Sequence, residues 1–147
     1  MTNSFGLDVN IIDAECPLNI DGVPFSNVAM ITLRIDGTQV LRAPDFSSAL
    51  IHFPELMASC HSSGTYLIFT CACGIADDGG WEGVQVVHDE ECIRWSFSVN
   101  ATPYAYVFDA RQYREAVEQV RIRLETLPAH VTLEPQHVVF PERWNQP

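Results

Sequence analysis

The residues best suited to chemistry gather between Thr70 and Cys92. This stretch holds three of the five cysteines, four of the eight glycines and six carboxylates, with no Lys or Arg among them. Two kinds of site follow from these residue types. Thiols can bind a metal ion, and clustered carboxylates can bind a cation or a basic protein surface.

The thiols form the first candidate site. Cys71 and Cys73 are one residue apart, so on an extended backbone their side chains point to the same face. A structural zinc site needs four ligands, and its paired cysteines usually enclose two residues. We therefore expect no cofactor; if zinc does bind, its ligands are Cys71, Cys73, Cys92 and His88. The alternative is that the paired cysteines are small buried hydrophobes that end a core strand.

The carboxylates form the second candidate site. Their spacing does not match the alternating ligands of a calcium loop. An aromatic residue beside carboxylates in a glycine-rich loop is typical of a binding surface, although Trp81 can equally anchor the loop on the core. We expect a partner-binding surface made of Asp77, Asp78, Trp81, Glu82, Asp89, Glu90 and Glu91.

Catalytic motifs are missing from the sequence. It contains no G-x-S-x-G elbow, P-loop, dinucleotide fingerprint or H-E-x-x-H helix, and its histidines are scattered. This favours a non-catalytic protein. An enzyme whose pocket the sequence does not reveal is the alternative.

The charge balance points to the kind of partner. The 147 residues carry a formal net charge of −11, and every positive side chain is an arginine. Nucleic acid and anionic membranes are poor partners, because binding them requires a basic patch. A basic protein is a better one, although many cytosolic proteins are acidic simply to stay soluble.

Length and composition favour one cytoplasmic domain spanning residues 1–147. A chain of this size can bury a core without disulfides or metal. Met1 to Asn10 does not read as a secretory signal, and no apolar run is long enough to span a membrane. We therefore expect reduced cysteines.

The first half of the chain predicts strands around a helical segment. Asp-Gly turns follow Ile20 and Ile35, and Val28 to Ile35 alternates like a half-buried strand that pairs with Thr38 to Ala43. Apolar spacing predicts helix from Asp45 to Cys60, divided at Pro54. Thr65 to Cys71 is typical of a central strand covered on both faces.

The second half predicts a hairpin and a long helix. Val84 to His88 returns as Ile93 to Val99 through the acids Asp89 to Glu91. A helix from Ala110 to Leu127 follows, and Pro128 stops it. An N-cap at Asp109, a capping box with Gln112 and a staple of Phe108 on Tyr113 mark its start. Its predicted ion pairs are Arg111/Glu115, Arg114/Glu118 and Arg121/Glu125.

These elements predict an α+β fold. The expected architecture is an antiparallel, meander-like sheet with the two main helices packed on one face. Val131 to Leu133 and His137 to Phe140 are expected to add short edge strands.

Four runs resemble a group of small bacterial proteins of uncharacterised function. They are F-T-C-A-C-G from Phe69, G-W-E-G-V-Q-V from Gly80, I-R-W from Ile93 and Y-V-F-D-A-R-Q-Y-R from Tyr106. Members of that group carry Cys-x-Cys-Gly, a later Cys-Gly, a hairpin and a Phe-Asp-x-x-Gln-Tyr helix. Here Asp78-Gly79-Gly80 stands where the later cysteine would be. By analogy, such proteins resemble immunity or accessory proteins of bacterial toxin systems.

Overall fold

The computed structural model describes residues 2–20, 22–40, 49–71, 83–99 and 101–135. Within these ranges the fold combines mainly antiparallel sheets with two helices, α1 (Phe53–Ala58) and α2 (Ala110–Leu124), as the α+β prediction requires. The strands are β1 (Phe5–Ile12), β2 (Leu18–Ile20), β3 (Val23–Phe25), β4 (Val28–Ile35), β5 (Thr38–Gln39), β6 (Ala49–Ile51), β7 (Gly64–Tyr66), β8 (Phe69–Cys71), β9 (Val84–His88), β10 (Cys92–Val99), β11 (Thr102–Asp109) and β12 (Thr132–Leu133).

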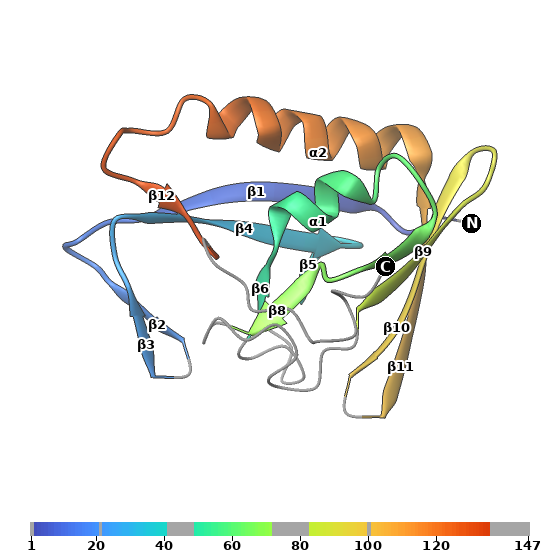
Figure 1. Cartoon of the computed structure of the whole chain (residues 1–147), viewed down its shortest axis with the longest axis horizontal. Helices are drawn as coiled ribbons and strands as arrows, with labels where there is room; N and C mark the ends of the chain where they lie inside the picture. Colours follow the sequence, from blue (N-terminus) through green and yellow to red (C-terminus); the bar gives the residue numbers. More distant parts are fainter. Residues whose placement is uncertain (1, 21, 41–48, 72–82, 100, 136–147) are drawn as a thin grey trace, which may run out of the picture.

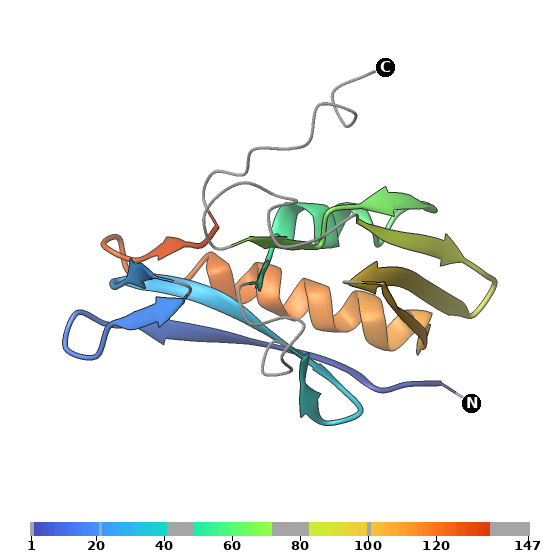
Figure 2. The same ribbon diagram turned by 90° about the horizontal axis from the view of Figure 1, so that it is seen from below.

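The strands divide between two four-stranded sheets and two ribbons. One sheet has the order β1-β4-β12, with β5 also on β4, and its β12 runs parallel to β4. The other, called here the hairpin sheet, has the order β11-β10-β9-β7 and is antiparallel throughout. The ribbons are β2–β3 and β6–β8. The hairpin sheet and the β2–β3 ribbon lie at opposite ends of the molecule (Figures 1 and 2).

The segment before β1 ties the two sheets together. Asn3 bridges to Phe108 in parallel; its N–H donates to the Val107 carbonyl at 2.6 Å, and its side-chain oxygen accepts from the Val107 N–H at 2.9 Å. On its other side, the Asp36 carboxylate accepts hydrogen bonds from the Asn3 side chain and the Ser4 N–H, each at 2.8 Å. These bonds hold the start of β1 between β11 and the turn that follows β4.

An aromatic core lies under α2. The helix runs along β1 (Figure 1) and also packs on β10 and β11, burying Tyr113, Val117 and Val120. Trp95, 1% exposed, is at the centre of this core. Its ring lies 5.1 to 6.1 Å, centroid to centroid, from those of Phe5, Phe69, Phe108 and Tyr113.

Several local predictions are confirmed. Hairpins β2–β3 and β4–β5 form where they were predicted, and positive φ angles at Asp36 (53°) and Gly37 (81°) give the second one a type I′ turn. The β9–β10 hairpin forms between the two runs predicted to pair, with the acids Asp89 to Glu91 connecting them. The α2 helix begins at Ala110, and the Asp109 side chain accepts a hydrogen bond from the Gln112 N–H at 2.9 Å.

The helix predicted from Asp45 to Cys60 is only partly correct. Residues 45–48 lie outside the described ranges, and Ala49–Ile51 is strand β6, which pairs antiparallel with β8. A short apolar run is ambiguous between buried helix and buried strand, and here pairing with a distant strand decides the outcome. The second part is helical, with Pro54 in the first turn of α1 as predicted.

Two strand predictions also need correction. Thr65 to Cys71 is not one strand: β7 joins the hairpin sheet, β8 joins the ribbon, and the buried Leu67 and Ile68 connect them. β4 is not half-buried, because Val28, Met30 and Thr32 on its second face are buried as well. Phe25 and Leu50 cover that face. β4 is therefore a central strand, and β1 is its main partner.

The capping box and the ion pairs of α2 differ from the prediction. Gln112 does not complete the box; its side-chain oxygen instead accepts from the Phe5 N–H of β1 at 3.0 Å. Of the three expected ion pairs, Arg121 to Glu125 is the one that forms among the described residues, at 2.7 Å. Arg121 also contacts Glu118 at 2.5 Å.

The remaining expectations have mixed outcomes. The edge strand after Val131 is present as β12, whereas residues 137–140 lie outside the described ranges. The arrangement of both helices on one face of a single sheet stays a prediction. No helix among the described residues is long and apolar enough to cross a membrane.

Candidate functional site

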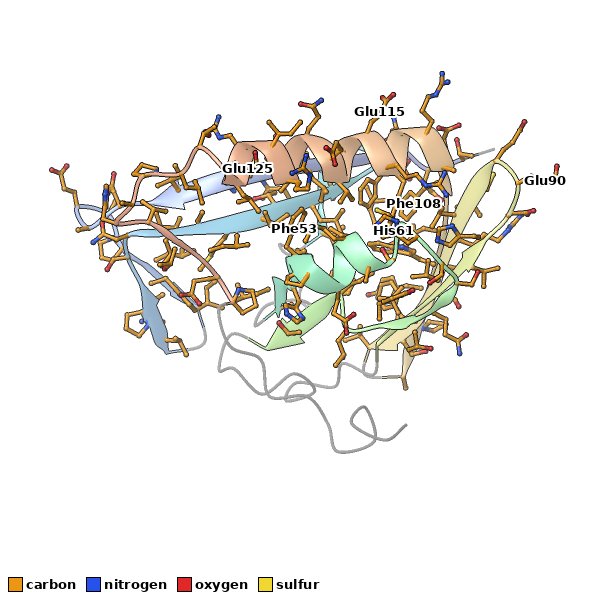
Figure 3. All side chains as sticks on the ribbon, turned by 45° about the horizontal axis from the view of Figure 1, so that its top comes forward. Phe53, His61, Glu90, Phe108, Glu115 and Glu125 are labelled. Atoms are coloured by element: carbon orange, nitrogen blue, oxygen red, sulfur yellow. The ribbon has the colours of Figure 1, made fainter. Side chains whose placement is uncertain are left out.

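The predicted partner-binding surface is described in part. Asp77, Asp78, Trp81 and Glu82 lie outside the described residues. The other three predicted residues, Asp89, Glu90 and Glu91, connect β9 to β10 and are all exposed. We call them the acidic tip. The hairpin end projects from the body of the molecule (Figure 1), and Figure 3 places Glu90 at its outermost point.

Backbone hydrogen bonds hold the acidic tip in place. The Asp89 N–H donates to the Cys92 carbonyl at 2.9 Å and closes the turn, and the Asp89 carboxylate accepts from the Glu90 N–H at 2.9 Å. The Glu91 carbonyl accepts from the Ala110 N–H at 2.9 Å. The last bond ties the tip to the first turn of α2, so the carboxylates are presented from a fixed backbone.

Arginines lie close to the acidic tip and compensate part of its charge. Asp89 forms an ion pair with Arg94 at 3.5 Å, and both side chains are more than half exposed, so water screens this pair. Glu90 and Glu91 line an open depression of about 460 Å³ together with Asp109, Ala110, Arg111 and Arg114. The lining of this depression therefore holds three carboxylates and two arginines.

A buried polar network lies behind the tip, and sequence reasoning missed it. The Tyr113 hydroxyl contacts the Ser59 hydroxyl at 2.5 Å and accepts from the Trp95 indole N–H at 3.2 Å. Burial raises the pKa of Tyr113 well above its ordinary value, and the hydrogen bonds from Ser59 and Trp95 oppose that shift. Tyr113 is therefore a neutral hydrogen-bonding group.

His88 extends this network toward the surface. Its Nε2 lies 2.7 Å from the Ser59 carbonyl, which can only accept, so Nε2 carries the proton. Its Nδ1 lies 3.3 Å from a guanidinium nitrogen of Arg114, which can only donate. Arg114 also donates to the Cys60 carbonyl at 3.2 Å. His88 thus joins β9 to the end of α1 and to α2, which explains why Arg114 does not pair with Glu118.

The structure also shows where the residues expected to hold zinc, if it binds, lie relative to one another. The network bonds use both His88 ring nitrogens, so no lone pair of the ring is directed to an open site. His88 pairs with the inward-facing Ile93, whereas Cys92 is the next residue along β10 and points to the opposite face. Cys71 belongs to β8 in a separate ribbon, and Cys73 lies outside the described residues. His88 and Cys92 are therefore not brought together.

Cys60 is a buried free thiol, and its surroundings are those of a structural cysteine rather than of a nucleophile. It is buried at the end of α1, and its thiol lies 3.7 Å from the Leu56 carbonyl. Burial raises the pKa of the Cys60 thiol to about 11, although Arg114 acts in the opposite direction. A thiol that is protonated at neutral pH is a poor nucleophile.

Two titratable groups sit at the start of α1, away from the tip. Burial lowers the pKa of His52 and raises the pKa of Glu55. Each side chain also forms a hydrogen bond with the backbone of Leu67, and each bond opposes the effect of burial. These bonds fasten α1 to the segment between β7 and β8, which is a structural task.

No family model matches the chain, and neither a curated protein nor a solved structure matches it.

Proposed function

We propose that the chain is a non-catalytic binding protein that engages a basic partner protein through its acidic tip. The observation that carries this proposal is the geometry of Asp89, Glu90 and Glu91. They are exposed, held at a projecting hairpin end by backbone hydrogen bonds, and opposed by one weak ion pair. Fixed carboxylates on a chain with a net charge of −11 speed association with a basic surface and exclude acidic competitors.

The proposal extends to the residues that the sequence links to the tip. Asp77, Asp78, Trp81 and Glu82 belong to the proposed surface by their proximity in sequence and their composition. An immunity-type inhibitor or an accessory protein acting in a bacterial cytoplasm is the concrete form that we favour. The resemblance of four sequence runs to small bacterial proteins supports this form by analogy.

Charge reversal tests the proposal. We expect the Glu90→Lys/Glu91→Lys variant to weaken binding to a purified basic partner at least tenfold at low salt and to flatten the dependence of binding on salt. The matched control is Glu15→Lys/Glu125→Lys, which makes the same change in net charge at two exposed positions, before β2 and at the end of α2, on the far side of the molecule from the tip (Figure 3). Equal losses in both variants would mean that net charge, rather than the tip, attracts the partner.

A further inference from the structure

The two faces of the hairpin sheet carry different residues. Residues alternate along β10, so that Ile93, Trp95 and Val99 are buried while Arg94, Ser96 and Ser98 are exposed. The same alternation holds on β9, where Val84 and Val86 are buried. We call the exposed side the outer face.

The centre of the outer face is free of charge. Thr65, Gln85, Ser96 and Ala105 align across all four strands, because Gln85 is opposite Thr65 on one side and opposite Ser96 on the other, and Ser96 is opposite Ala105. All four are exposed. They line an open depression of about 430 Å³, whose other lining residues are also uncharged: Gly83, Phe97, Ser98, Pro103 and Tyr104. The lining of this depression is therefore neutral, although the chain carries a net charge of −11.

A row made of Val87, Arg94 and Val107 lies between this depression and the acidic tip. Arg94 is flanked by Val87 on β9 and Val107 on β11. Val87 is 51% exposed, the highest fraction among the four exposed large hydrophobic side chains of the described residues. Moving outward along the hairpin, the outer face therefore passes from neutral polar residues to two valines on either side of Arg94, and then to carboxylates, one of which, Asp89, pairs with Arg94.

We propose that the outer face of the hairpin sheet is the docking surface for the basic partner, with the acidic tip at its rim. This inference rests on the proposed function. Protein interfaces commonly have a charge-depleted centre and a charged, solvated rim, and the order of residues on this face follows that pattern. The partner's complementary surface is a neutral or apolar patch edged by Lys and Arg.

The solvent side of α2 offers a contrast. Its Arg121 is already bonded to Glu118 and Glu125, so charges of both signs neutralise one another there. Because these charges are paired within the chain, little unpaired charge remains there for a partner protein to bind. The outer face has no charge at its centre, and the carboxylates at its rim face mostly water.

Photo-cross-linking can locate the partner on this face. Benzoylphenylalanine replaces Val87 in one variant and Ile122, an exposed residue of α2 (43%), in the control. Both are irradiated in low-salt soluble extract of the organism that encodes the chain, and the adducts are identified by mass spectrometry. The inference expects a Val87 adduct with a protein of positive net charge that is missing from the Ile122 control. An adduct with a second copy of this chain, an adduct within the chain, or no adduct overturns it.

Binding of the purified adduct protein then separates the two proposals. We expect Ser96→Arg to weaken binding about tenfold, because it sets a bulky cation against a basic partner at the interface centre. Gln119→Arg on α2 makes the same charge change and should alter binding less than threefold. If Glu90→Lys/Glu91→Lys weakens binding while Ser96→Arg does not, the outer-face inference fails and the proposed function stands. If none of these variants changes binding, both proposals fail.

Discussion

On the inner face of the hairpin sheet, Trp95 and Phe97 of β10 pack against aromatic rings, whereas Ser96 and Ser98 on the outer face of the same strand are short, polar and exposed. Ile93 and Trp95 are completely or almost completely buried, and Ser96 is in water. The same strand therefore serves two purposes. Because the large buried side chains of β10 are on its inner face, substitutions on the outer face should cost little folding free energy, which leaves that face available for recognition.

The largest expected effect comes from two adjacent residues of β10. Trp95→Ala should lower the free energy of unfolding by about 3–5 kcal/mol, because it leaves a cavity among Phe5, Phe69 and Phe108. Ser96→Ala, one residue away on the outer face, should change it by less than about 0.5 kcal/mol. Urea unfolding followed by circular dichroism measures both. Comparable losses would show that the outer face also carries the fold.

Thiol reactivity sharpens the same comparison. Burial raises the pKa of Cys60 to about 11, whereas Cys92 points to the outer side and is only half-buried. Alkylation of Cys60 at neutral pH should be about 100-fold slower than that of an ordinary free thiol, because its thiolate is correspondingly rare. Peptide mass spectrometry after timed exposure to iodoacetamide measures the rates. A Cys60 that reacts as fast as Cys92 would contradict the buried placement of α1.

Removing two tyrosine hydroxyls compares the contribution of a buried hydrogen bond to stability with that of an exposed one. Tyr113→Phe should cost about 1–3 kcal/mol of unfolding free energy, because it leaves the buried Trp95 N–H without its acceptor. The Tyr66 hydroxyl contacts the Ser62 carbonyl and hydroxyl at the surface, where water can replace it. Tyr66→Phe should therefore cost less than about 1 kcal/mol. Equal costs would mean that the network behind the tip is open to water.

Sequence patterns predicted the structural features that depend on residues close together in the chain. The start of α2 was predictable because its N-cap and staple lie within a few positions of one another. The β9–β10 hairpin was predictable because its two runs are close in sequence and one of them alternates clearly. Strand β11 also has a period-two signal in Tyr104, Tyr106 and Phe108, but Pro103 and the lack of a turn motif conceal it.

The candidate site was only partly predictable for the same physical reason. The acids of the tip stand together in the sequence, so their common exposure could be expected. The bonds from His88 to Ser59 and Arg114 join residues 29 and 26 positions apart, and no local pattern marks them. The neutral outer face depends on the alignment of four strands, which periodicity within one strand does not determine.

The smallest expected effect is on the pH dependence of the unfolding free energy, through the partly buried His52 at the start of α1. Burial holds the pKa of His52 below its ordinary 6.5, so in the window just below pH 6.5 the unfolded chain binds more protons than the folded chain. His52 therefore contributes stability above this window that is lost as the pH falls through it. Glu55, whose pKa burial raises above 4.5, contributes with the opposite sign, so the two must be separated by substitution. His52→Gln should flatten the rise in unfolding free energy between pH 5 and 7 (about the range in which histidine changes charge), as measured by urea unfolding at each pH. Parallel pH profiles for the wild type and the variant would show that the His52 imidazole is exposed to water in the folded chain. That result would contradict its burial at the start of α1.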